Sequence, residues 1–139
     1  MGKFKDLHNK LTRKSRAEIN ASINEIIRGR TEEILNMNRA QMQAGIKPDG
    51  EQIGEYQSEK YAELKGHSYV DLFLTGDMYY SMFVDVDSQR ILIGSEDSKT
   101  ENLLERYGDF FGLTSENKKR LGEQIKKDIA AYYRELFSV

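Results

Sequence analysis

Three charged residues of this 139-residue chain follow the order seen in magnesium-dependent nucleases. Asp49 follows Pro48, and Asp97 stands two positions before Lys99, which imitates a P-D then D-x-K pattern. In that pattern two carboxylates hold Mg²⁺ and orient a water molecule, and both must lie on adjoining strands of one hairpin. Here Pro48-Asp49-Gly50 is a turn sequence and a predicted helix separates it from Asp97, so we expect two exposed turns instead.

Two further constellations lack a part that their chemistry requires. Asp85-Val86-Asp87 could begin a calcium-binding loop, but its sixth position, where the sharp turn requires glycine, is Arg90. A Ser-His-Asp site would need His8 or His67, and neither has a strand-turn-helix nucleophile elbow nearby. The chain has no cysteine and no glycine motif for phosphate binding. We therefore expect no catalytic residue, no metal site and no cofactor.

The composition describes a single small domain with a modest core. Charged residues make up 32% of the chain, which also has eight tyrosines and six phenylalanines. A formal net charge of −2, a pI near 5.8 and a mean hydropathy of −0.70 argue against a surface that is basic throughout and against residence in a membrane. No apolar run approaches the ~18 residues that cross a bilayer, and the N-terminus lacks the apolar centre of a secretory signal. Tyrosine-rich, highly charged chains of this size are typical of subunits that complete their buried surface in an assembly.

The chain is predicted to consist of a basic N-terminal arm, residues 1–16, and one α+β domain, residues 17–139. Ser15 and Glu18 have the spacing of a capping box, and the apolar spacing after them predicts a long helix over about residues 15–44, with Gly29 as a tolerated defect. The turn sequence at 48–50 then reverses the chain.

The middle of the domain is predicted to be a small antiparallel sheet with short helices. In residues 70–74, Val70, Leu72 and Leu74 occupy every second position, which is the period of a strand. Thr75 can cap, through its hydroxyl, a short helix that follows a sharp turn at Gly76. Residues 83–86 and 90–93 predict a hairpin, with further short helices over 58–65 and 99–107. A long C-terminal helix, capped by Thr114 or Ser115, follows. The order of a long helix, a small antiparallel sheet and a second long helix predicts an α+β fold rather than a fold of repeated βαβ units.

Tyrosines on the short and the long helix have different expected environments. Tyr133, Leu136 and Phe137 lie on an apolar stripe, so we expect them in the core. Tyr79 and Tyr80 lie on different faces of a short helix, so at least one should face solvent or a partner. The acidic bias of residues 71–109 is opposite in sign to the arm, which suggests that in a ring the arm of one subunit lies on the acidic body of the next.

Three short motifs occur in a fixed order along the chain. They are the turn at 48–50, an L-x-x-T-G-like segment that runs from Leu72 through Met78 to Ser81, and an F-F-G-L-T element at 110–114 before the last helix. In this order they resemble the small morphogenesis proteins of tailed bacteriophages, the tail-completion and head-to-tail joining family. The motif residues are Pro48, Asp49, Gly50, Leu74, Thr75, Gly76, Ser81, Phe111, Gly112, Leu113 and Thr114.

The resemblance implies a noncatalytic virion structural protein, assembled in the host bacterial cytoplasm, that forms a ring or collar at the portal, the head-tail junction or the tail. It implies other copies of the chain and portal, connector or tail proteins as partners, with weak contact to packaged DNA and none to a membrane. The candidate interface residues are Lys3, Lys5, Lys10, Arg13, Lys14, Arg16, Tyr79 and Tyr80. Two alternatives stay open: a Mg²⁺-dependent phage nuclease that uses Asp49, Asp97 and Lys99, and a DNA-binding accessory protein that uses the basic arm.

Overall fold

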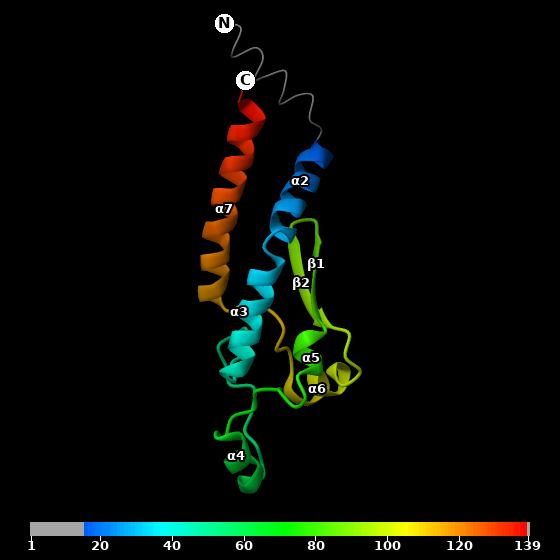
Figure 1. Cartoon of the computed structure of the whole chain (residues 1–139), viewed down its shortest axis with the longest axis vertical. Coiled ribbons are helices and arrows are strands. Elements are labelled where there is room, and N and C mark those ends of the chain that lie inside the picture. Colours follow the sequence, from blue (N-terminus) through cyan, green and yellow to red (C-terminus); the bar gives the residue numbers. More distant parts are fainter. Residues whose placement is uncertain (1–15, 139) are drawn as a thin grey trace, which may run out of the picture.

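The computed structural model of the chain describes residues 16–138 and shows an elongated α+β fold (Figure 1). Helices α2 (Arg16–Arg28) and α3 (Thr31–Gln43) run along the long axis, and α7 (Ser115–Phe137) returns antiparallel beside them. Between them come α4 (Glu59–Lys65), α5 (Asp77–Tyr80), β1 (Met82–Asp87), β2 (Arg90–Ser95) and α6 (Thr100–Tyr107). The predicted fold class is confirmed, including its long C-terminal helix. Within residues 16–138 no helix is both long and apolar enough to cross a membrane.

The predicted single N-terminal helix is wrong in one respect, because the chain forms two helices that are separated at Gly29 and Arg30. The Arg30 N–H bonds to the Ile27 carbonyl, three residues back, and Arg30 has φ −101° and ψ 13°. Glycine is a poor helix former, so an exposed Gly29 favours an interruption here. The side chain of Arg30 then reaches α7, where its Nε and Nη2 donate to the two carboxylate oxygens of Asp128 at 2.7 and 2.8 Å.

The predicted hairpin is confirmed as β1 and β2, which pair antiparallel. Its turn residues Ser88 and Gln89 have φ of 48° and 64°, as a type I′ turn requires. One face of the hairpin packs on α2 and α3. The tip is fixed to α2, because the backbone N–H of Gln89 donates to Asn24 Oδ1 and its side chain donates to Asn20 Oδ1, both at 2.9 Å.

Residues 70–74, predicted as a strand, form an irregular segment instead. Val70, Asp71 and Leu72 are all buried, so the segment lacks the alternation of buried and exposed side chains that a half-buried strand shows. Leu72 has φ of 62°, which breaks the extended geometry. The Asp71 carboxylate accepts the N–H of Phe73 at 3.0 Å, a local side-chain bond that competes with sheet pairing.

The predicted cap at Ser15 lies outside the described residues, and of the two other predicted caps one is shifted. Gly76 turns the chain with φ of 88° and is itself the N-cap of α5, while Thr75 Oγ1 accepts the Asp77 N–H at a long 3.4 Å. Thr114 caps α7 as predicted, because its hydroxyl accepts the Asn117 N–H at 3.3 Å. The short helices predicted over 58–65 and 99–107 are confirmed as α4 and α6.

The core lies where α3, the hairpin and the F-F-G-L-T element meet, with Ile34, Met42 and Phe110 fully buried. The prediction that Tyr133, Leu136 and Phe137 belong to the core is wrong, since they are half-buried and outside the core cluster. They lie in the last turns of α7, beside α2 and away from the hairpin and α3 (Figure 1).

Candidate functional site

Two of the three sequence motifs lie against each other in the structure. A Cβ added to Gly112 would lie 3.1 Å from Pro48 Cγ, and Gly112 has φ of 129°. Only glycine fits both the close approach and this backbone conformation. Asp49 closes its turn by accepting the Glu51 N–H at 2.9 Å. The folded chain therefore joins the turn at 48–50 and the F-F-G-L-T element into one region.

Two amide side chains of α3 hold the F-F-G-L-T element. Asn38 Nδ2 donates to the Phe110 carbonyl at 3.1 Å, and Asn38 Oδ1 accepts the Gly112 N–H at 3.0 Å. Gln41 Nε2 donates to the Gly112 carbonyl at 2.8 Å, and Gln41 Oε1 accepts the Thr114 N–H at 3.0 Å. Asn38 is 0% and Gln41 6% exposed. These amides satisfy backbone groups that have no neighbouring strand, and we call them the amide clamp.

Sequence reasoning missed the amide clamp, although a signal was available. Leu35, Asn38 and Met42 recur at helical three- and four-residue steps, and all three are buried. A polar residue on the apolar stripe of a helix needs hydrogen-bond partners inside the protein. The spacing thus marked Asn38 as a buried amide, but it could not identify the partner segment.

A second polar cluster surrounds the Asp71 carboxylate at the base of α4. Asp71 Oδ1 lies 3.0 Å from the Tyr56 hydroxyl, 2.9 Å from Lys65 Nζ and 3.0 Å from the Phe73 N–H. Asp71 Oδ2 lies 3.3 Å from His67 Nε2. Lys65 Nζ also donates to the Phe73 carbonyl at 2.7 Å. Both carboxylate oxygens are thereby engaged, and the cluster anchors the α4 segment to the body of the domain.

Electrostatics within this cluster favour the charged carboxylate. Burial acts to raise the pKa of Asp71, but the bonds from the Phe73 N–H, Lys65 and Tyr56 outweigh it and hold the pKa below its ordinary value of 3.8. Burial, together with the nearby Asp71 charge, raises the pKa of Tyr56 to about 12. Burial also raises the pKa of Tyr79, whose hydroxyl donates to the Asp71 carbonyl. The cluster is therefore stable as a carboxylate among neutral phenols.

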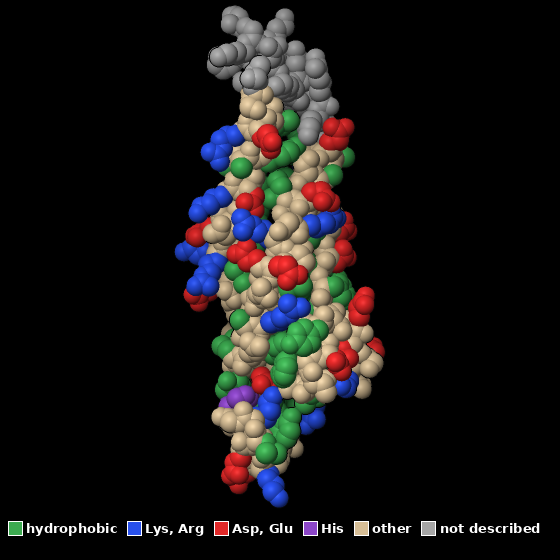
Figure 2. Space-filling model, viewed as in Figure 1, with side chains coloured by type: hydrophobic (Ala, Val, Ile, Leu, Met, Phe, Trp, Pro, Cys, Tyr) green, Lys and Arg blue, Asp and Glu red, His purple; other side chains and the backbone are tan. Residues whose placement is uncertain are grey.

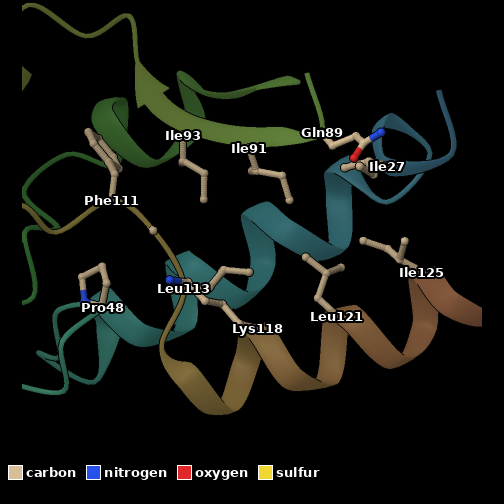
Figure 3. Close-up of a pocket in the computed structure, with 12 residues that line it drawn as sticks. Ile27, Pro48, Gln89, Ile91, Ile93, Phe111, Leu113, Lys118, Leu121 and Ile125 are labelled. Atoms are coloured by element: carbon tan, nitrogen blue, oxygen red, sulfur yellow. The ribbon is translucent and has the colours of Figure 1, made fainter. Parts of the chain in front are cut away.

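An apolar groove of about 490 Å³ lies between the hairpin and α7 (Figure 3). Ile91 and Ile93 of β2 point into it from one side, and Leu121 and Ile125 of α7 from the other. One end is lined by the joined motif region, through Pro48, Phe111, Gly112 and Leu113. The side of β2 and the side of α7 that carry these residues, which we call their inner sides, therefore face each other across the groove.

The outer face of the hairpin, which points away from α2 and α3, carries exposed apolar side chains. Phe83 is 40% and Leu92 64% exposed, and Tyr80, just before β1, is 79% exposed. A shallow hollow of about 500 Å³ on this face is lined by Asp85, Asp87, Ser88, Arg90 and Leu92. We call the surface formed by Phe83, Leu92 and the lining of this hollow the outer hairpin face.

The residues of the nuclease pattern lie in turns. Asp49 accepts the Glu51 N–H, and Asp97 accepts the Lys99 N–H at 3.2 Å, each an Asx-type bond to a backbone group two residues on. Across residues 16–138 no group of three or more His, Cys, Asp or Glu side chains is placed to hold a metal ion.

The predicted interface residues have different environments. Lys3, Lys5, Lys10, Arg13 and Lys14 lie outside the described residues, and Arg16 is exposed in the first turn of α2. Tyr80 is exposed, as an interface residue must be. Tyr79 is only 2% exposed and packs edge-on against Phe73, so its prediction as an interface residue is wrong.

Comparison of the chain with models of protein families, with curated proteins and with solved structures finds no match. The fold therefore establishes that this protein belongs to the α+β class.

Proposed function

We propose that the chain is a noncatalytic structural subunit of a tailed-phage virion that forms a ring or collar at the portal, the head-tail junction or the tail. The observation that carries the assembly part is the outer hairpin face. Single exposed apolar residues are common on monomers, but here Phe83 and Leu92 share the outer face of the two-stranded sheet that residues 16–138 form. A two-stranded sheet gains stability when its faces are covered, and a neighbouring subunit would supply that cover.

The virion part of the proposal rests on the ordered motifs. The contact between Pro48 and Gly112 and the amide clamp give two of these motifs a shared structural purpose, because they build one end of the groove beside α7. The polar clusters at Asn38 and Asp71 form their bonds within the fold, which suits a subunit that acts by assembly. Its partners would be other copies of the chain and portal, connector or tail proteins.

Mass photometry and negative-stain electron microscopy of the purified full-length chain test the assembly. We expect a discrete closed oligomer whose population grows with concentration, whereas a strict monomer at the highest soluble concentration would contradict the proposal. Immunogold labelling of particles from the phage that encodes the chain tests the location. Label at the head-tail junction or along the tail is expected, and absence of the chain from purified particles would refute a virion function.

The same preparation separates the two alternatives. Cleavage of duplex DNA that depends on Mg²⁺ would support the nuclease, and a catalytic Asp97 would then be required. Retention on DNA that weakens as salt rises would support the DNA-binding accessory protein.

A further inference from the structure

Building on the proposed function, we propose that the partner on the outer hairpin face is a second copy of this chain, which contacts it through the outer face of its α7. Such a contact joins two different surfaces of the same protein, so copies associate head to tail and a ring closes by rotation. The outer face of α7 is the side that carries Lys119, Lys126, Lys127 and Arg134, with Glu123 as an acidic residue among them, all exposed.

The two surfaces lie on opposite sides of the molecule. Ile91 and Ile93 of β2 and Leu121 and Ile125 of α7 line the same groove, so the inner sides of the two elements face each other (Figure 3). The outer sides must therefore point in opposite directions. Two surfaces placed this way can be engaged at the same time in a row of subunits, one by the preceding copy and one by the following copy.

The charges of the two sides are opposite in sign. Between residues 77 and 109 the chain has eight acidic and three basic residues, and most of the acids are exposed. Helix α7 has six basic and four acidic residues, and one of those acids, Asp128, is engaged by Arg30. Figure 2 shows many basic side chains along the α7 edge, with some acidic ones among them, and mostly acidic side chains along the hairpin edge. Complementary potentials of this kind steer association and fix its orientation.

Shape and apolar content fit the same pairing. One face of the hairpin already packs on α2 and α3, and its other face exposes Phe83 and Leu92. A helix laid on this outer face would complete a helix-sheet-helix arrangement, the usual way in which a sheet buries both sides. Lysine side chains on α7 can lay their aliphatic stems over Leu92 and Phe83 while their ammonium groups reach Asp85. The half-buried Tyr133 and Phe137, which stack at 6.1 Å, add aromatic surface near the end of α7.

Two charge-reversal variants of the full-length chain test this pairing. The hairpin variant carries Asp85→Lys and Asp87→Lys, and the helix variant carries Lys119→Glu and Lys126→Glu. Each variant alone presents like charges at the contact, so we expect its self-association constant to fall about tenfold or more at low salt. In an equimolar mixture, the basic hairpin of one variant meets the acidic helix of the other, so mixing should restore oligomers in mass photometry.

A matched control reverses exposed charges away from both surfaces, with Glu59→Lys and Lys60→Glu on α4, and should assemble as the wild type does. Circular dichroism melts verify that every variant is folded. Wild-type assembly by either variant alone, or failure of the folded mixture to assemble, would overturn the inference and leave the proposed function standing. A wild-type chain that never associates would overturn both.

The N-terminal arm is the competing occupant of the outer hairpin face. A variant with Lys3→Glu, Lys5→Glu and Lys10→Glu distinguishes it from α7. If this variant loses assembly while the helix variant keeps it, the arm occupies the face and the inference about α7 is wrong. Loss in the helix variant with assembly retained in the arm variant supports α7.

Discussion

Replacing Asn38 by alanine should destabilise the domain severely, because Asn38 is fully buried and bonds to two backbone groups of the F-F-G-L-T element. The substitution leaves the Phe110 carbonyl and the Gly112 N–H without a partner. An unsatisfied buried polar group costs roughly 1–3 kcal/mol, so the loss of partners for both groups should lower the free energy of unfolding by about 2–6 kcal/mol. That is a large part of the ~5–15 kcal/mol by which domains of this size are stable.

Urea denaturation followed by circular dichroism measures this loss, with the wild type and both variants at one protein concentration. Asn36→Ala is the matched control, because Asn36 lies on the same helix, is exposed, and makes only a 3.4 Å contact with Arg39. Both substitutions bring the same gain in helix propensity, so their difference isolates the buried bonds. A loss for Asn38→Ala within about 0.5 kcal/mol of the control would refute the amide clamp as a stabilising element.

Three further changes test other parts of the fold. Gly122→Ala should raise the free energy of unfolding by about 0.5–1 kcal/mol, because no atom beyond its chain neighbours and the adjacent backbone of its own helix lies within 4 Å of the added Cβ. Gly45→Ala should lower the free energy of unfolding, since Gly45 has φ of 76° and the added Cβ would lie 2.6 Å from the Tyr69 ring. Urea denaturation of both variants checks this contrast. The pKa of Asp71 is lower in the folded than in the unfolded chain, so the stabilisation from its carboxylate is present above pH 3.8 and is lost as pH falls through the folded pKa. In melts recorded between pH 2 and 6, the fall in melting temperature towards acid pH should therefore be smaller for Asp71→Asn than for the wild type. An equal fall in both proteins would contradict this prediction. Gly76→Val should lower the melting temperature far more than Thr75→Ala, because a Cβ at Gly76 would lie 2.7 Å from the Tyr80 ring, whereas the Thr75 hydroxyl makes only a long bond; equal effects would contradict this.

Local signals predicted the elements that local chemistry controls. Thr114 caps α7 through its own hydroxyl, as predicted, and the helix predicted over 58–65 is capped in the structure by the Ser58 hydroxyl and ended by Gly66 in the left-handed conformation that glycine adopts easily. The hairpin followed from two β-rich runs around a short polar turn. In each of these cases the partner groups lie within a few residues, so the sequence contains the whole interaction.

The errors arose where a distant segment decides the local structure. Residues 70–74 alternate like a strand, yet Asp71 takes partners from Tyr56, Lys65 and His67, and the segment bends to reach them. The apolar stripe of α7 continues to Phe137, but a stripe reports only which side of a helix is apolar and not how much of the rest of the chain covers it.

The sequence by itself determined the α+β class, most helix ends, the hairpin and the absence of a cysteine-based site, because these follow from periodicity, capping chemistry and composition. Only the tertiary structure decided that Pro48 meets Gly112, that Asn38 and Gln41 clamp the F-F-G-L-T element, and that Tyr79 is buried while Tyr80 is exposed. It also placed the acidic hairpin side and the basic α7 side on opposite flanks of the molecule. These features depend on contacts between residues far apart in the chain, whose geometry is fixed by the packing of the whole core and not by any local pattern.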